Sequence, residues 1–257
     1  MNNYGWGLPI QASTFAGQID SGLWIIHAAM IGVFVLWGIF FTYLLIKYRR
    51  RDGVAVRHEE HGEMTSLIPD LLVMVFEIGL IVFYALPAWR SIKMTMPDPK
   101  DALVVEVTAE QFGWNIRYPG PDGKFGRTKP ELVHFSNPLG LDRTDPAAAD
   151  DIVVSNEMHL PVNAKVLIKL RSKDVVHDLF VPEFRLKQDA MPGLETPMWV
   201  EPNRIGHYEM ACAQLCGFGH SLMRGDVYVE SREDFDKWLK SRAALNPAPP
   251  TASSEGF

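Results

Sequence analysis

The chain is poor in cysteine, with only two among its 257 residues, so a framework of several disulfides is excluded. Neither cysteine belongs to a C-x-x-C-H motif, which excludes covalently attached c-type haem. Residues 1–21 contain no lysine or arginine, so the beginning lacks the basic segment of a secretory signal peptide. Lysine and arginine together number 25 against 31 aspartates and glutamates, and this balance makes nucleic acid an unexpected partner.

Two long apolar runs stand in the first third of the chain. Residues 22–46 and residues 67–89 are each long enough to cross a bilayer as a helix. The second run contains Asp70 and Glu77 and has Pro87 near its end. Ionisable groups in a membrane span are functional candidates. The pattern predicts a hairpin of two transmembrane helices in contact with membrane lipid.

The charges around these runs indicate an orientation. The segment between them is basic, and its cations are Lys47, Arg49, Arg50, Arg51 and Arg57. Because basic loops stay in the cytoplasm, we expect both termini to lie on the outer face of the membrane.

The pattern changes to short alternating segments from about residue 98 onward, among them residues 103–108, 165–170 and 225–229. They predict an all-β Greek-key sandwich outside the membrane. We expect three parts: residues 1–97 with the helix hairpin, a β domain over residues 98–240, and a disordered tail over residues 241–257. Residues 119–151, rich in Pro, Gly and Asp, are expected to be a long insertion between strands.

One short segment gathers the residues that bind soft metal ions: Cys212, Cys216, His220 and Met223. Thiolate, thioether and imidazole together favour copper, and a second thiolate four residues from the first indicates two copper ions bridged by both sulfurs. A disulfide, a structural zinc ion or buried unliganded cysteines are the alternatives.

With two spans, an outer β domain and this segment in hand, the chain resembles subunit II of the haem–copper cytochrome c oxidases over about residues 20–240. Residues 212–223 are similar to that family's C-x-x-x-C-x-x-x-H-x-x-M signature. Residues 174–179 and residues 187–193 resemble its upstream motifs and come in the same order.

The resemblance implies a cupredoxin-like domain that holds the binuclear copper centre CuA. Its ligands would be His177, Cys212, the backbone carbonyl of Gln214, Cys216, His220 and Met223. The subunit would accept electrons from a cytochrome c-type donor and pass them to subunit I, which reduces oxygen to water and translocates protons, with subunit III as a further partner. The expected place is a bacterial cell membrane. This chain would deliver electrons and would not reduce oxygen alone.

Three departures from the family pattern matter. Gln214 stands where the family has an acidic residue that also binds magnesium at the junction with subunit I, and this leaves the magnesium contact unsupported. Phe112 replaces the tryptophan that accepts electrons, with Trp114 as an aromatic neighbour that could equally be core. The glutamate that leads protons into subunit I falls on Asp70, which shares a helix face with Glu63 and Glu77.

Three other functions compete with this interpretation. A related quinol oxidase subunit lacks the copper ligands, and nitrous-oxide reductase carries a similar motif on a soluble chain. A membrane-tethered copper carrier is the alternative from another class. Exposure of the metal site would distinguish the two, because a carrier needs an accessible ion whereas an electron-transfer centre is shielded.

Overall fold

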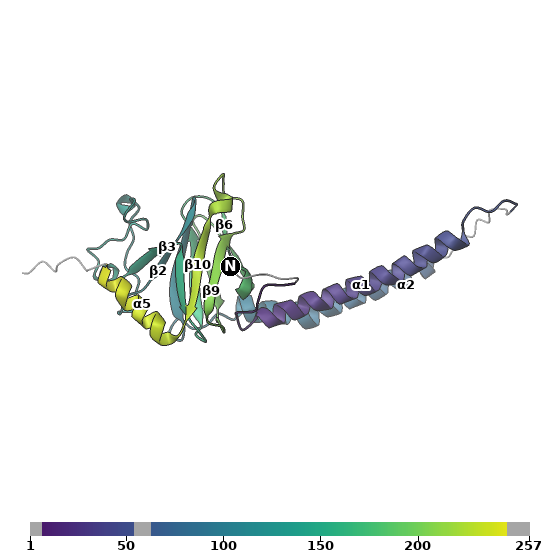
Figure 1. Ribbon diagram of the computed structural model, residues 1–257, viewed down its shortest axis with the longest axis horizontal. Coiled ribbons are helices and arrows are strands. Elements are labelled where there is room, and N and C mark those ends of the chain that lie inside the picture. The colour runs from purple at the N-terminus through teal and green to yellow at the C-terminus, as the bar shows by residue number, and fades with distance from the viewer. Residues whose placement is uncertain (1–6, 54–62, 246–257) are drawn as a thin grey trace, which may run out of the picture. The chain divides into compact units, whose positions relative to one another are not determined.

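The computed structural model describes the backbone of residues 7–53 and 63–245, and these residues form two units. One unit is the helical segment from Gln18 to Met94, and the other joins the residues up to Gly17 with those from Thr95 onward. Figure 1 shows the helices and the strands of these units.

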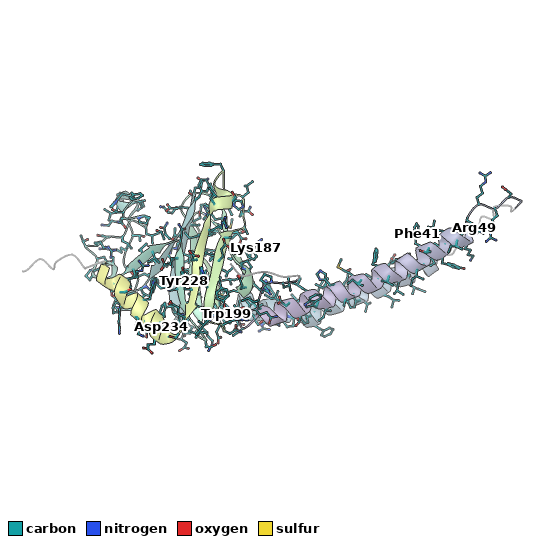
Figure 2. All side chains as sticks on the ribbon, in the orientation of Figure 1. Phe41, Arg49, Lys187, Trp199, Tyr228 and Asp234 are labelled. Atoms are coloured by element: carbon teal, nitrogen blue, oxygen red, sulfur yellow. The ribbon has the colours of Figure 1, made fainter. Side chains whose placement is uncertain are left out.

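The helical unit contains α1 (Ala16–Lys47) and a second long helix. The second helix runs through α2 (Glu63–Leu80), the π-helical turn η1 (Ile81–Ala85), α3 (Leu86–Trp89) and the π-helical turn η2 (Arg90–Met94). Both are long and apolar enough to cross a membrane, over Ala16–Lys47 and Leu67–Met94. In Figure 2 side chains such as Phe41, which is 60% exposed, project outward from this unit.

The spans are longer than the expected ranges 22–46 and 67–89. The second helix continues past Pro87 to Met94. Proline lacks the backbone N–H that a helix needs, and the π-helical turns on either side of it accommodate this local disruption.

A close contact joins the two helices. The Tyr84 hydroxyl donates a hydrogen bond of 2.6 Å to the Gln18 carbonyl, although the two residues lie 66 positions apart. Gly22 faces the same ring, and a Cβ atom there would lie 2.7 Å from it. The helices therefore form the expected hairpin, with a glycine permitting their close approach.

The second unit is a sandwich of two sheets. In the described part of the chain each sheet has five strands, in the orders β3-β2-β1-β5-β8 and β4-β10-β9-β6-β7. The strands are β1 (Leu103–Glu110), β2 (Gly113–Tyr118), β3 (Ile152–Ser155), β4 (Glu157–Pro161), β5 (Val166–Ser172), β6 (His177–Val181), β7 (Leu186–Ala190), β8 (Thr196–Val200), β9 (Gly206–Cys212) and β10 (Arg224–Glu230).

Alternation along the strands builds the core. On β1 the side chains of Val105, Val107 and Ala109 are fully buried, whereas the residues between them are partly exposed. Strand β1 pairs in parallel with β5, and β10 pairs in parallel with β4. These pairings between strands distant in the sequence agree with the expected Greek-key sandwich.

Two boundaries of the expected domain are wrong. The described residues before α1, residues 7–15, belong to the β unit, because Ala12 N–H donates to the Glu183 carbonyl at 2.9 Å and Ser13 forms a β-bridge with Pro202. At the other end α5 (Arg232–Leu245) extends past residue 240, so residues 241–245 are helical and the domain is not purely β. The rest of the expected tail, residues 246–257, lies outside the described residues.

The helix α5 is held by aromatic packing. Its Phe235 is 1% exposed, and the ring of its Trp238 stacks on His159 of β4 with centroids 4.0 Å apart. This packing stabilises a helix whose other residues are mostly charged.

The long insertion lies where it was expected, between the end of β2 at Tyr118 and the start of β3 at Ile152. It contains two short helices, η3 (Pro130–Leu132) and α4 (Pro146–Ala149), and two isolated β-bridges. Buried polar contacts from Arg117 on β2 tie the insertion to the sheet.

Candidate metal centre

Three strands bring the predicted ligands together at one end of the second sheet. His177 is the first residue of β6 and Cys212 the last residue of β9, and these strands are antiparallel with Leu179 opposite Cys212. The segment after Cys212 returns to β10, and Cys212 N–H donates to the Met223 carbonyl at 3.0 Å. This bond closes a loop that folds over the end of the sheet.

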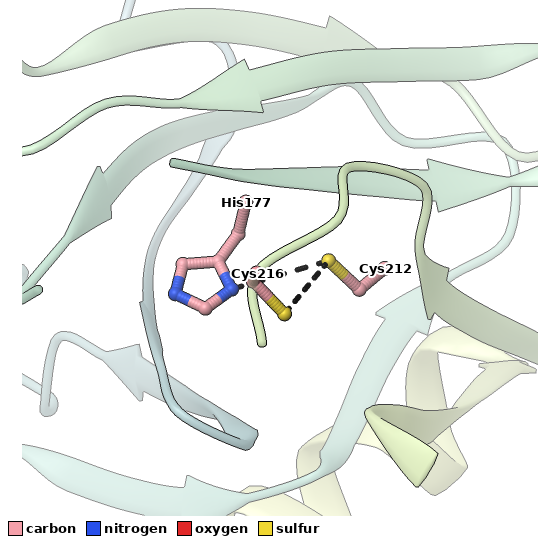
Figure 3. A group of neighbouring side chains, drawn as sticks. All are labelled: His177, Cys212 and Cys216. Carbon is pink, nitrogen blue, oxygen red and sulfur yellow. Dashed lines mark hydrogen bonds between the residues drawn. The ribbon is translucent and has the colours of Figure 1, made fainter. Parts of the chain in front are cut away.

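The two cysteines are free, and their sulfur atoms lie 3.9 Å apart. Nδ1 of His177 lies 3.9 Å from the Cys212 sulfur, and the three ligand atoms are all within 4.8 Å of one another. Figure 3 shows the His177 ring facing this sulfur pair. Donors bound tetrahedrally at about 2.0–2.3 Å from a metal ion lie roughly 3.5–3.8 Å apart, so the spacing fits shared coordination. A disulfide, with its sulfurs about 2 Å apart, does not describe this arrangement.

The other predicted ligands adjoin the same sulfur atoms. Nδ1 of His220 lies 3.6 Å and Sδ of Met223 lies 3.9 Å from the Cys216 sulfur. The carbonyl oxygen of Gln214 lies 3.2 Å from the Cys212 sulfur. The structure therefore gathers all six predicted donors, and the Gln214 side chain itself is exposed.

The sulfur donors are shielded from solvent. Cys212, Cys216 and Met223 are 8%, 5% and 0% exposed, and His177 is fully buried. Burial, followed by the neighbouring Cys212 sulfur, raises the pKa of the Cys216 thiol to about 11. A thiol in such surroundings becomes a thiolate when a cation replaces its proton, so a metal ion bound here would release that proton.

A carboxylate that sequence reasoning gave no role orients His177. Oδ1 of Asp174 lies 2.8 Å from Nε2 of His177, and because a carboxylate only accepts, Nε2 carries the proton and Nδ1 faces the sulfurs. Although burial opposes the change, hydrogen bonds from His177 and from two backbone N–H groups lower the pKa of Asp174. A carboxylate three residues before a ligand histidine was the available signal.

The two predicted electron-accepting aromatics differ in their surroundings. Trp114 is 1% exposed, and its ring centroid lies 6.3 Å from that of His177. Phe112 is half-buried and makes an edge-to-face contact of 5.0 Å with Phe218. Phe218, which sequence reasoning missed, lies between Cys216 and His220 in the chain and is 98% exposed.

The predicted proton-route residues lie on α2, in the helical unit. Asp70 and Glu77 are exposed and two helical turns apart, in agreement with the shared face expected from their spacing. Glu63 is the first residue of α2, and its side chain lies outside the described residues. Their role in proton transfer stays a prediction.

The chain is similar in sequence to a known protein family and to several of its characterised members. The family described as cytochrome C oxidase subunit II, periplasmic domain, matches residues 103–231. The alternative cytochrome c oxidase subunit 2 of Bradyrhizobium diazoefficiens is 34% identical over 240 residues, which cover 92% of this chain and 84% of that protein. Cytochrome c oxidase subunit 2 of Thermostichus vulcanus is 35% identical over 201 residues, which cover 77% of this chain and 49% of that protein.

A solved structure is also similar. The periplasmic domain of subunit II of cytochrome oxidase (CoxB) of Bradyrhizobium japonicum aligns with a TM-score of 0.44 and 26% identity, covering 59% of this chain and 99% of that chain. The match over residues 103–231 contains every predicted copper ligand, and the first relative extends the similarity over most of the chain. The chain belongs to the cytochrome c oxidase subunit II family.

Proposed function

We propose that this chain is the electron-accepting subunit of a proton-translocating cytochrome c oxidase. It takes electrons from a cytochrome c-type donor at a binuclear CuA centre and passes them to the haem–copper subunit I, where oxygen is reduced. The observation that carries the proposal is the buried pair of free cysteines, 3.9 Å apart, with two histidines and a methionine adjoining them.

The donor set fits copper better than zinc. Copper bound here would be held by the Cys212 and Cys216 thiolates with the neighbouring histidines and thioether, and it would supply a centre that accepts and releases one electron. Zinc would use the cysteines and histidines alone, whereas here the soft Met223 thioether also faces Cys216, at 3.9 Å. The protein holds these donors at fixed separations and excludes water from the sulfurs.

Burial also separates the two candidate functions. A copper carrier has to release its ion to a partner, so its thiolates need to be reachable. Here Cys212, Cys216 and Met223 are each at least nine-tenths buried, and His177 is held by Asp174. A shielded and oriented donor set favours electron transfer over copper delivery.

Electron acceptance near Phe112 is supported by its surroundings. Its ring touches Phe218, which is 98% exposed and two residues from each of two proposed ligands. A donor docking there would contact an aromatic surface next to the metal loop. Trp114 is a core residue behind His177 and serves to pack that ligand.

Magnesium does not fit this chain's own residues. The exposed Gln214 side chain offers a neutral amide where a hard divalent cation prefers a carboxylate. The Gln214 side chain is therefore a poor ligand for magnesium. Gln214 contributes its backbone carbonyl, 3.2 Å from the Cys212 sulfur, and any residue at this position supplies that group.

The helical unit supports membrane anchoring beside subunit I and subunit III. Two helices long and apolar enough to span a bilayer are joined by a basic segment, and this charge pattern favours a cytoplasmic position for that segment, with the copper domain on the outer face of a bacterial cell membrane. Asp70 and Glu77 are the candidates to line a proton route toward subunit I.

Copper stoichiometry and the spin-resonance spectrum of the purified full chain test the proposal. We expect two copper ions per chain and a signal spread over both ions. Cys216→Ser should abolish this signal because a hydroxyl is a poor bridging ligand for soft copper. A delocalised two-copper signal that survives in Cys216→Ser would refute the assignment.

A further inference from the structure

One residue outside the ligand motifs touches both ligand-bearing segments. Gln111 begins the two-residue turn between β1 and β2, strands of the first sheet, whereas the predicted ligands come from the second sheet. The turn reaches the metal loop from the opposite side of the sandwich.

Two hydrogen bonds connect Gln111 to these segments, and a third, between Asp174 and His177, extends one of them to a predicted ligand. Its backbone N–H donates to Oδ2 of Asp174 at 2.7 Å, and Oδ1 of the same carboxylate accepts from Nε2 of His177 at 2.8 Å. Its side-chain amide donates to the backbone carbonyl of Cys216. A single residue thus links the histidine segment to the cysteine loop.

The metal loop is shaped to accept this turn. Gly217 has φ of +140°, and a Cβ atom there would lie 2.9 Å from Nε2 of Gln111. A Cβ atom on Gly219 would lie 2.5 Å from the Phe112 ring. The two glycines therefore allow the loop to lie directly against Gln111 and Phe112, and a larger residue at either position would force the surfaces apart.

The exposure of Gln111 argues against a role in the hydrophobic core. Its side chain is largely exposed, and exposed polar residues contribute little to the stability of a fold. Its contacts instead converge on the surroundings of His177 and Cys216, whose positions determine how well a metal ion is held.

We propose that Gln111 is a positioning residue for the copper ligands, fixing His177 through Asp174 and fixing the loop at Cys216. This inference rests on the proposed copper function. Partners one step beyond the ligands commonly change metal affinity by about 10–100-fold when removed. Loss of the Gln111 amide should have an effect in this range, since the loop at Cys216 loses a donor that holds it.

Gln111→Leu and Gln111→Glu isolate the side chain. Both variants keep the backbone N–H that Asp174 accepts, and neither offers a side-chain donor to the Cys216 carbonyl. The matched control is Asn203→Leu, which also replaces an exposed amide by leucine. Asn203 precedes the start of β9 and is therefore at the opposite end of this strand from Cys212.

The experiment uses the full chain in detergent, stripped of copper and titrated with copper(I) against a chromogenic copper(I) chelator. Near-ultraviolet circular dichroism of the copper-free protein reports folding, and spin resonance after one-electron oxidation reports the electronic structure of the centre. We expect both Gln111 variants to fold as the wild type does, to bind copper about tenfold or more weakly and to give an altered spectrum. Asn203→Leu should match the wild type throughout.

Each other outcome overturns the inference in a recognisable way. Wild-type affinity and spectrum in both Gln111 variants would show that the amide does not position the ligands. Loss of the copper-free fold in both would show a structural role instead. If the wild type and Asn203→Leu bind no copper, the proposed function fails, and this inference fails with it.

Discussion

Arg117 offers a quantitative test of how the insertion is attached. Its side chain is 3% exposed and lies 3.0 Å from Glu106, against Asp151, which is fully buried. It also donates to the Gly126 carbonyl at 2.6 Å, within the insertion. Removing one partner of a buried ion pair costs about 3–5 kcal/mol because the other charge is left buried. Arg117→Met should destabilise the outer domain by about this amount, a large part of a typical domain stability.

The pH dependence makes the prediction specific. Burial raises the pKa of Asp151 above its usual 3.8, and the hydrogen bond from Arg117 opposes that shift. Without Arg117 the pKa rises further, so the folded state holds a proton that the unfolded chain releases above about pH 4. The loss of stability in Arg117→Met should therefore be small below pH 4 and grow as pH increases.

Denaturant unfolding of the copper-free full chain, followed by tryptophan fluorescence between pH 3 and pH 8, measures this effect. The control is the double variant Arg117→Met with Asp151→Asn, which has no carboxylate at 151 to bury and should lose the pH-dependent part. A loss below about 1 kcal/mol in Arg117→Met, or one that is the same at every pH, would refute the reasoning.

Three further predictions concern other parts of the chain. Met223→Leu should bind copper with an altered reduction potential while Met158→Leu, an equally buried change on β4, leaves it unaltered; equal potentials would show Met223 to be only packing. Hydrogen bonds from Lys129 and Thr144 lower the pKa of Asp142 to about 2. The wild type should therefore have a higher unfolding midpoint than Asp142→Asn above about pH 4, and this difference should disappear toward pH 2. Gly22→Val should lower the thermal stability of the helix pair, measured by circular dichroism in detergent, whereas Gly32→Val, where an added Cβ meets nothing within 4 Å, should not.

Local pattern was enough to predict the main elements. Alternation along residues 103–108 predicted β1, and the Pro- and Gly-rich composition of residues 119–151 predicted the insertion between β2 and β3. Four candidate donor side chains, Cys212, Cys216, His220 and Met223, could be proposed from spacing and residue type alone because they lie within twelve consecutive residues, whereas His177 and the Gln214 carbonyl followed only from the family resemblance.

The remaining features depend on contacts between distant residues. Nothing in residues 8–15 indicates that the Ala12 N–H donates to the Glu183 carbonyl, because the two residues are far apart in the sequence. Half of the residues of α5 are charged, and the stacking of Trp238 on His159 together with its edge-to-face contact with Tyr118 explains why the helix is stable. The proposed role of Gln111 likewise depends on contact between a turn of the first sheet and a loop of the second, and no local periodicity in the sequence predicts such a contact.

Unfolding experiments with and without copper can distinguish residues that stabilise the fold from residues that position the copper ligands. A copper ion that binds only the folded state adds stability set by its concentration relative to its dissociation constant, about 2.7 kcal/mol at a hundredfold excess. Arg117 lies at the insertion and acts on the fold, so its variant should lose the same stability with and without copper. Gln111 acts on the ligands, so its variants should lose stability only when copper is present. Unfolding each variant in both states therefore distinguishes residues that maintain the sandwich from residues that maintain the centre.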